Sequence, residues 1–233
     1  MSNVNILSGG AAQGLVGSLS SAFKAQTGLD IAGEFGAVGA MAEKLRGGAT
    51  ADMVILTSTL VAKLAEEKLV VAASMADVGL VETALAVRTG DPQVTVSDAT
   101  GLRDALLAAD AIFVPDTEAS TAGIHVANVL DRLGITEVVA ARLRIFPNGA
   151  TAMRELAASK ARRPIGCTQS TEIISTEGVT LSGSLPPGCE LATMYTAGIT
   201  ARAAHAAQAQ KLIDLLTGAG QQREHAGFIS RQN

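Results

Sequence analysis

The stretch NILSGGAAQGLVGSLSSAFKAQTG, residues 5–28, indicates the fold class of this chain. Its opening apolar run breaks into small residues at positions 8–11 and resumes with helical spacing. Leu15, Leu19 and Phe23 recur at the interval that places side chains on one face of a helix. The chain therefore opens with a strand, a glycine-rich turn and an amphipathic helix, which is the pattern of an α/β protein.

The turn at Ser8, Gly9 and Gly10 has the chemistry of an anion-binding loop. Glycine lets a ligand approach the backbone, and the following helix start presents unpaired N–H groups that favour negative charge. The loop has neither the Gly-Lys-Ser/Thr ending of a Walker loop nor the G-x-G-x-x-G spacing of a dinucleotide loop. Two interpretations of this loop stay open: a bound anion, or glycine that serves only the geometry of the turn.

The composition indicates a compact globular protein. Of 233 residues, 48% are hydrophobic and 17% are charged, which suffices for one large domain or two small lobes. The net charge of −4, one Tyr, five Phe and no Trp provide neither a basic stripe nor a stacking platform, so no nucleic acid partner is expected. Cys167 and Cys189 are predicted to be reduced, buried thiols, and the histidine spacing does not form a metal cluster. No metal and no cofactor are expected.

The amino-terminal sequence MSNVNILSGGAAQG lacks the features of an export signal, and no apolar run reaches the length of a membrane span. As written, the sequence predicts a cytoplasmic protein without a membrane span. If a leader preceded it, a periplasmic location would be expected, and only such an exported form would meet an ABC transporter permease.

Short β-rich runs alternate with amphipathic helical segments along the chain. Strands are predicted at residues 4–7, 29–35, 53–56, 111–115, 142–146 and 164–168. This alternation predicts an α/β protein with parallel sheet. In the predicted helix at residues 121–134, Ile124, Val129 and Leu130 are expected to share the face toward the core.

Two extended runs are interpreted as crossings between two lobes. Residues 79–92 lead out of the first lobe, and residues 189–204 lead back to it before a final helix. The predicted fold is two-lobed and α/β, with residues 1–82 and 193–233 in lobe 1 and residues 83–192 in lobe 2. A ligand is expected between lobes that close about a hinge.

Loops rich in Gly, Ser, Thr and Asn join strand ends to helix starts. The carboxyl ends of strands line the ligand crevice of open α/β sheets, although ordinary helix capping explains any one such loop. Six such loops with almost no Lys or Arg favour a small anion held by N–H groups and hydroxyls. The candidate ligand-binding residues are Ser8, Gly9, Gly10, Ala37, Val38, Gly39, Ser58, Ser120, Thr121, Asn148, Thr168, Gln169, Ser170 and Thr171.

Four segments together resemble the periplasmic molybdate-binding receptors of ABC transporters, which have the type II solute-binding fold. They are the opening strand with its small-residue loop, FGAVGAMAEKLRGGATADMVIL, PDTEASTAGIHVANVLDRLGI and IGCTQSTEI. The likeness extends over most of the chain, and GGATAD is its most telling block. It implies two α/β lobes and an oxyanion or carboxylate bound by hydroxyls and backbone amides at the hinge.

The chain departs from the family pattern in three loops. Gly10 stands at the family's first-loop serine, Ala37 and Val38 lie near its second-loop serines, and Gln169 stands at its tyrosine. These differences remove side-chain donors that a tetrahedral oxyanion uses. The remaining Ser, Thr and Gln side chains are better suited to a larger, asymmetric carboxylate.

Two functions follow from the resemblance. The first is the binding of a small carboxylate or oxyanion. The second is a cofactor-independent isomerase of unsaturated tricarboxylates, since aconitate isomerase is similar to this family and its allylic proton shift needs carboxylate anchors with a general acid or base. Glu118, His125 and Glu172 are the candidate proton carriers. Each also has a structural interpretation, as a solvated side chain, a helix-interior residue and a helix first-turn residue respectively.

Overall fold

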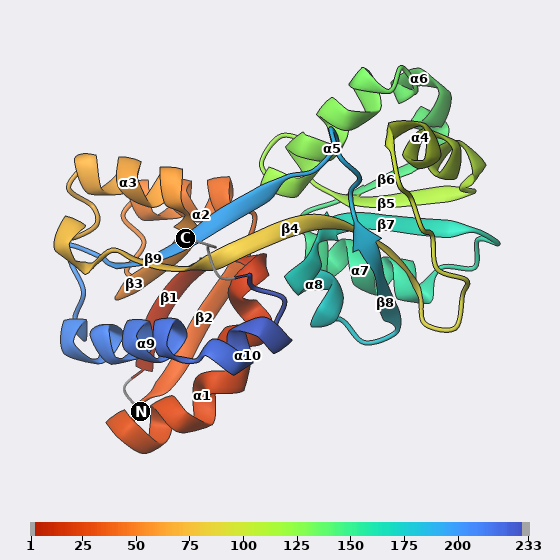
Figure 1. The fold of residues 1–233 in the computed structure, drawn as a ribbon. Coiled ribbons are helices and arrows are strands. Elements are labelled where there is room, and N and C mark those ends of the chain that lie inside the picture. Colours follow the sequence, from red (N-terminus) through yellow and green to blue (C-terminus); the bar gives the residue numbers. More distant parts are fainter. Residues whose placement is uncertain (1–2, 230–233) are drawn as a thin grey trace. The chain divides into compact units, whose positions relative to one another are not determined.

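The computed structural model describes residues 3–229, which form two compact units. The chain divides after Val81 and again after Ala192, so unit 1 contains both ends of the chain and unit 2 is one continuous segment. The first division falls within strand β4 (Ala76–Arg88) and the second at the start of strand β9 (Ala192–Ile199) (Figure 1).

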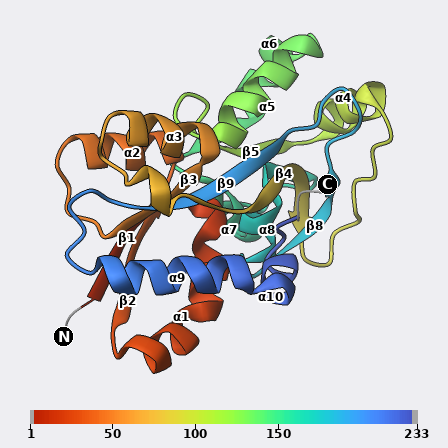
Figure 2. The same cartoon turned by 60° about the vertical axis from the view of Figure 1, so that its left-hand side comes forward.

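Unit 1 has a sheet between two layers of helices. Its strand order is β2-β1-β3-β9, in which β1 is parallel to both β2 and β3, and β9 runs antiparallel to β3. Helices α1 and α9 lie on one face of this sheet, and α2 and α3 lie on the other (Figures 1 and 2). Its other elements are β1 (Asn3–Gly9), η1 (Gly10–Ala12), α1 (Gln13–Thr27), β2 (Asp30–Gly36), α2 (Val38–Arg46), β3 (Met53–Thr57), α3 (Ser58–Glu66), η2 (Ala72–Ser74), α9 (Ala206–Gly218) and α10 (Gly220–His225).

The first helix follows the sequence pattern closely. Leu15, Leu19 and Phe23 of α1 are buried in the core of unit 1, as predicted. The helix ends at Gly28, whose left-handed φ of 74° lets its N–H donate to the carbonyl of Lys24 at 2.8 Å. Glycine adopts this conformation without a steric penalty, which explains where the helix stops.

The GGATAD block ends in a buried carboxylate that joins distant parts of unit 1. Asp52 is 2% exposed, and its two oxygens accept hydrogen bonds from the N–H groups of Asn5 and His205, each at 2.8 Å. Strand β1 and the turn before α9 are thereby attached to the start of β3. Through Asp52, the GGATAD block therefore joins three segments of unit 1 by hydrogen bonds.

Unit 2 is a second α/β arrangement with its own core. Its sheet has the order β4-β7-β5-β6, with β8 also paired to β4. Strand β5 is parallel to β6 and β7, whereas β4 is antiparallel to β7 and β8. Helices α4, α5 and α6 pack on one face, and α7 and α8 pack on the other. Its other elements are α4 (Ala99–Ala108), β5 (Ala111–Pro115), α5 (Thr121–Arg132), α6 (Thr136–Val139), η3 (Ala140–Arg142), β6 (Leu143–Phe146), α7 (Gly149–Ala158), β7 (Pro164–Gln169), α8 (Ser170–Ile174) and β8 (Val179–Ser184).

Each predicted strand is present, but the parallel sheet expected from the sequence is mixed. The antiparallel partners are β4, β8 and β9. Strands β4 and β9 contain the positions where the chain passes from one unit to the other, and β8 has no counterpart among the predicted strands. The sequence pattern identified the strand–helix alternation, and it did not reveal these antiparallel additions.

The predicted core face of α5 was wrong at one position. Ile124 is 41% exposed, whereas Val126, Val129 and Leu130 are buried. Residues three or four apart share a helix face, so Val126 aligns with Val129 and Leu130. Ile124 precedes Val129 and Leu130 by more than four residues, so its side chain lies on another face of α5 and points away from the core.

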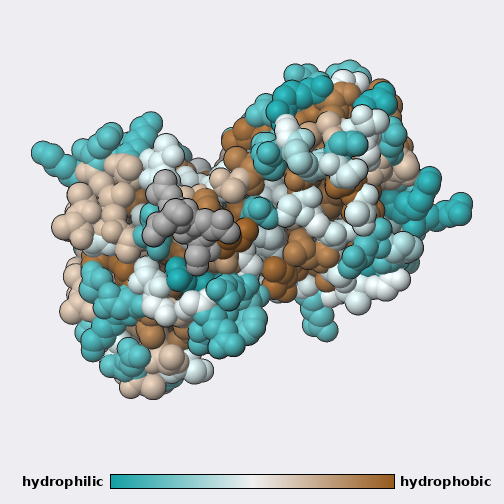
Figure 3. All heavy atoms as spheres, viewed as in Figure 1, coloured by the Kyte–Doolittle hydropathy of each residue, from teal (hydrophilic) through white to brown (hydrophobic). Residues whose placement is uncertain are grey.

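Within residues 3–229, no helix combines the length and the apolarity that a membrane span needs. On the face shown in Figure 3, hydrophilic and hydrophobic residues intermingle. The exposed large hydrophobic residues include Val71, Val138 and Ile145, which come from separate segments of the chain.

Candidate functional site

In unit 1, the carboxyl ends of three parallel strands bring the first predicted loops to one sheet edge. Ser8 of β1 is in register with Phe35 of β2 and Ile55 of β3, and Gly9 is in register with Gly36. The three strands end at neighbouring positions and lead into η1, α2 and α3. The loops after β1, β2 and β3 therefore share the edge where α/β sheets bind ligands.

Gly9 is a point of close packing at this edge. A Cβ atom on Gly9 would lie 2.7 Å from Val38 Cγ1 and 2.9 Å from Tyr195 Cε1. Tyr195 belongs to β9, is 2% exposed, and meets Phe228 edge to face with ring centroids 6.4 Å apart. The chain's one tyrosine thus reaches the first loop from a strand far along the sequence. The sequence analysis missed it because no turn or loop marks this position.

Several predicted binding residues of unit 1 are packed within the loops. Ser8 is fully buried, and its hydroxyl donates to the carbonyl of Gly9 at 2.9 Å. Ala37 and Val38 are buried before and at the start of α2, whereas Ser58 is half-buried at the start of α3. Ser58 is therefore a candidate-site hydroxyl of this edge that a ligand can reach, unlike Ser8.

Several helices in both units begin without a capping side chain in the described part of the chain, whereas Asp98 caps α4 by accepting from the N–H of Gly101 and Asn148 caps α7 by accepting from the N–H of Thr151. Across the described residues, no side-chain hydrogen bond caps the N-terminus of α1, α2, α3 or α5. The residues at these positions are Ala12, Ala37, Thr57 and Ser120. The starts of α2, α3 and α5 keep N–H groups that hydrogen-bond an anion readily, whereas α1 continues from η1 and the N–H of Gln13 donates to the carbonyl of Gly10.

Helix α7 differs, because an internal carboxylate occupies its start. Glu172 is 5% exposed, and the hydroxyl of Thr168 donates to its Oε2 at 2.6 Å. The backbone N–H groups of Gly149, Ala150 and Gln169 also donate to this carboxylate. Burial raises the pKa of Glu172 above its ordinary value, and the four hydrogen bonds oppose this effect without cancelling it. Glu172 is the buried acid of the candidate site.

The raised pKa of Glu172 gives the folding stability a defined dependence on pH. The unfolded chain has a glutamate pKa of about 4.3, so between that value and the folded pKa the folded state binds more protons. The free energy of unfolding contributed by Glu172 is therefore largest below the unfolded pKa and falls as pH rises through the folded pKa. The native protein is compared with Glu172→Gln. Over the pH interval between the unfolded and the folded pKa, the ratio of the native folding constant to that of the variant should fall by about tenfold per pH unit. Urea denaturation of both proteins from about pH 4 to about pH 8 measures this difference, and an advantage that grows with pH would contradict the assignment.

Two buried hydroxyls near Glu172 have no hydrogen-bond partner within the described part of the chain. They belong to Thr83, which is 1% exposed, and Thr171, which is 2% exposed. Thr83 of β4 is directly opposite Gln169 of β7, so it lies beside the strand end that leads into α8. Buried hydroxyls normally have partners, so this pair indicates a place where a ligand supplies them. Thr83 was also missed, since it lies in the middle of a long strand.

The other candidate proton carriers make different contacts. Glu118 is exposed, and its backbone N–H donates to Asp116 Oδ1 at 2.8 Å; this bond and one from Ala119 lower the pKa of Asp116. His125 Nε2 lies 2.8 Å from the carbonyl oxygen of Cys189 and joins α5 to a distant turn. A role for Glu118 or His125 in proton transfer stays a prediction.

Both cysteines are free and buried, as the sequence predicted. Burial raises the pKa of Cys167 to about 12, so its thiol is protonated at neutral pH. A buried, protonated thiol is a poor nucleophile. Cys167 therefore belongs to the core of unit 2 and not to reactive chemistry.

Two α/β units, with the chain passing between them twice and small-residue loops at the carboxyl ends of their parallel strands, define a type II periplasmic-binding-protein-like fold. The chain belongs to the bacterial extracellular solute-binding protein family, whose model matches residues 4–228. This membership confirms the molybdate-receptor-like family and the fold that the sequence motifs indicated.

Individual proteins resemble this chain at low sequence identity. The periplasmic molybdate-binding protein of Azotobacter vinelandii is 18% identical, with a TM-score of 0.82 over 99% of this chain and 100% of that one. The sulfate-binding protein SubI of Mycobacterium tuberculosis H37Rv is 17% identical, with a TM-score of 0.77 over 100% and 88%. A curated aconitate isomerase from Pseudomonas sp is 24% identical over 226 residues, which cover 93% of this chain and 82% of that protein. The structural likenesses establish the fold.

Proposed function

We propose that this chain binds a small carboxylate or oxyanion through hydroxyls and backbone N–H groups. The observation that carries the proposal is the pair of buried hydroxyls of Thr83 and Thr171, which have no partner among residues 3–229 and lie at the edge of unit 2 where the predicted loops lie. The starts of α2, α3 and α5, which no side chain from residues 3–229 caps, add N–H donors that favour negative charge. Family membership and fold neighbours named for molybdate and sulfate also support an anionic ligand.

Glu172 favours an asymmetric carboxylate over a symmetric oxyanion. Its carboxylate already occupies the N–H groups of Gly149 and Ala150, so a ligand anion has to use other donors. An ionised Glu172 also repels negative charge close to it. A ligand that has a carboxylate at one end and an uncharged part near Glu172 avoids this repulsion, whereas a tetrahedral dianion carries charge in every direction.

The binding proposal predicts a thermal shift that depends on hydroxyls in both units. A panel of carboxylates and oxyanions should contain one that raises the melting temperature, because a ligand that binds only the folded state stabilises it by about 2.7 kcal/mol at a hundredfold excess over Kd. Ser170→Ala in unit 2 and Ser58→Ala in unit 1 should each weaken that ligand about five- to tenfold. The matched control is Ser18→Ala, an exposed serine within α1.

The pattern of effects decides how the ligand is held. If both Ser58→Ala and Ser170→Ala weaken the same anion while Ser18→Ala does not, both units contribute to one site. The ligand position between the lobes stays a prediction until then. If no anion in the panel raises the melting temperature, the proposed function is wrong. An ABC transporter permease is proposed as a partner only for an exported form of the chain.

A second candidate function is a cofactor-independent isomerase of unsaturated tricarboxylates. The observation that favours it is Glu172, a buried carboxyl whose pKa is raised by burial and which can exchange a proton with a ligand, together with the curated aconitate isomerase relative. A base removes a proton from the methylene carbon, the double bond shifts by one position, and the former vinyl carbon takes up a proton. Proton NMR of cis-aconitate in deuterated buffer should then show the trans isomer with deuterium incorporated, and Glu172→Gln should abolish it. Binding with an unchanged spectrum would favour the carrier.

A further inference from the structure

Unit 2 contains a cavity at the end of its sheet opposite to the predicted ligand loops. The cavity has a volume of about 250 Å³. Its walls come from β4, β7, α4 and the segment 91–94, and it lies beside Pro164 and Ile165, where β7 begins. The predicted ligand loop follows Gln169 at the other end of that strand. The cavity is therefore separate from the proposed anion site.

The cavity has an apolar interior and a polar rim. Val87, Val94, Ala105 and Ile165 are among the side chains that line its interior. The hydroxyl of Ser182 holds the backbone of Val94 through two hydrogen bonds. The N–H of Val94 donates to Ser182 Oγ at 2.6 Å, and the carbonyl of Val94 accepts from the same hydroxyl at 3.1 Å. This wall is formed before any ligand binds, which lowers the entropy cost of binding.

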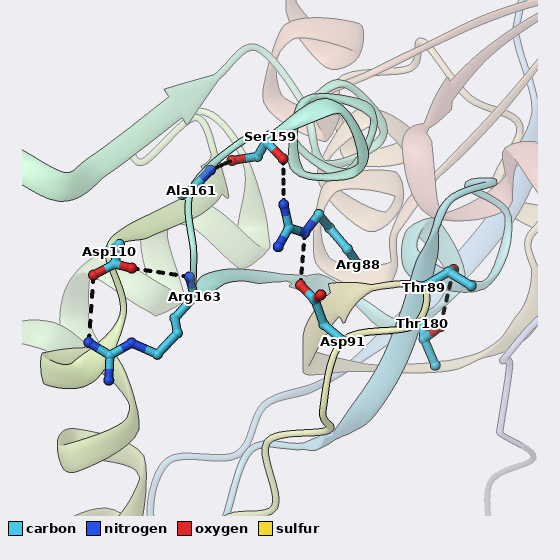
Figure 4. A network of polar contacts seen from close by, with 8 residues as sticks. All are labelled: Arg88, Thr89, Asp91, Asp110, Ser159, Ala161, Arg163 and Thr180. Atoms are coloured by element: carbon cyan, nitrogen blue, oxygen red, sulfur yellow. Dashed lines mark hydrogen bonds and ion pairs between the residues drawn. The ribbon is translucent and has the colours of Figure 1, made fainter.

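Polar contacts also fix the rim, as Figure 4 shows. Arg88 Nε lies 2.8 Å from Asp91 Oδ2, and its Nη1 donates to the carbonyl of Ser159 at 2.6 Å. These contacts attach the segment that begins at Asp91 to the segment that leads to Arg163. They also neutralise Asp91, so this carboxylate does not oppose an incoming anion.

The arginines of the rim leave an excess of positive charge. Arg163 is 67% exposed, and its Nη2 lies 3.6 Å from Asp110 Oδ1, an exposed ion pair of the kind that contributes little. Neighbouring Arg162 is exposed and makes no hydrogen bond or ion pair with any residue from 3 to 229. Of the charged residues that line the cavity, Asp91 is paired with Arg88, whereas Arg162 and Arg163 leave at least one guanidinium available to a ligand.

We propose that this cavity binds a small monocarboxylate with an apolar body. The carboxylate lies at Arg162 and Arg163, and the body packs against Val87, Ala105 and Ile165. Guanidinium groups pair with carboxylates in a two-bond geometry, which gives the charged end its orientation. The volume lies below the range of about 300–1,000 Å³ for ordinary small-molecule sites, so the ligand is short. This site goes beyond the proposed anion function and does not depend on it.

Hexanoate titration of the full chain, followed by amide and methyl NMR, tests the proposal. Saturable shifts are expected at Val94, Ala105 and Ile165. 1-Hexanol, which has the same apolar body without the charge, should bind at least about tenfold more weakly. Arg162→Gln and Arg163→Gln should each weaken hexanoate by about fivefold or more, and Ala105→Leu, which fills the cavity, should remove the shifts. Thermal melting checks that each variant is folded.

Arg103→Gln is the matched control. Arg103 is exposed on α4 and pairs with Asp104 at 3.6 Å, the same distance as the pair of Arg163 with Asp110, but it does not line the cavity. The proposal is overturned if hexanol binds as tightly as hexanoate, if both rim variants behave like Arg103→Gln, or if shifts occur only near residues 116–121 or 168–172. The last result would place hexanoate in the proposed anion site, so failure of one proposal is distinguishable from failure of the other.

Discussion

Gly123→Ala is expected to destabilise the protein by about 3 kcal/mol or more. Gly123 lies in the first turn of α5, and a Cβ atom there would be 2.0 Å from the carbonyl oxygen of Asp116 and 2.6 Å from that of Pro115. Both atoms belong to the backbone at the end of β5, so no side-chain rotation relieves the clash. The helix would have to move away from the strand that it covers. Urea denaturation of the variant and the native protein measures the loss.

Gly101→Ala is the matched control for this substitution. Gly101 also lies in the first turn of a unit 2 helix, but a Cβ atom there would meet Asp98 Oδ1 at 3.6 Å, an ordinary contact. Alanine favours helix over glycine by about 1 kcal/mol, so this variant should be unchanged or slightly more stable. Equal stability of the two variants would show that α5 accommodates a side chain at Gly123, contrary to the structure.

Gly149→Ala is expected to cost about 2–4 kcal/mol and to disrupt the buried acid. A Cβ atom at Gly149 would lie 1.9 Å from Glu172 Oε2 and 2.2 Å from Thr168 Oγ1. The carboxylate would have to leave the start of α7 and lose its hydrogen bonds there. Because Glu172 is one of the two side chains in conflict, removing it should relieve part of the clash, while the contact with Thr168 Oγ1 stays. Denaturation of Gly149→Ala, Glu172→Ala and the double variant forms the test.

The double variant distinguishes steric conflict from a general loss of stability. If Glu172 is the group in conflict, Gly149→Ala should be less destabilising in the Glu172→Ala background than in the native protein. Additive losses would mean that Gly149 and Glu172 act independently. That outcome would remove the argument that glycine is required here for the carboxylate to reach the helix start.

The sequence predicted the strand–helix alternation because that signal is local. Apolar spacing and glycine turns identified the strands and the first helix within a few residues. The antiparallel placement of β4, β8 and β9 depends on pairing between distant segments, which local periodicity does not encode. The prediction for Ile124 was wrong for a related reason, since the apolar residues of α5 are compatible with more than one choice of the helix face that packs on the core.

The sequence indicated which loops contribute to the candidate site, but it did not indicate which side chains contact one another there. Ser170 and Glu172 follow a recognisable strand end, whereas Thr83 and Tyr195 come from the interiors of long strands with no turn to mark them. The burial of Glu172 depends on α7, which contributes the N–H groups of Gly149 and Ala150. A helix first-turn glutamate and a buried acid have the same sequence signature, and only the tertiary packing separates them.

The division of the chain implies an order of events during protein synthesis. Unit 2 is one uninterrupted segment, so all of it has been translated before the last strand of unit 1 appears. Strand β3 pairs with β9, so Met53 cannot pair with Ile199 until the ribosome has synthesised and released that part of the chain. The pairing of Leu80 with Ile229 closes even later. Pairings between segments so far apart form slowly, and until they form the edge of β3 is open to other chains. The nascent protein is therefore expected to depend most on chaperone protection in its first-made half.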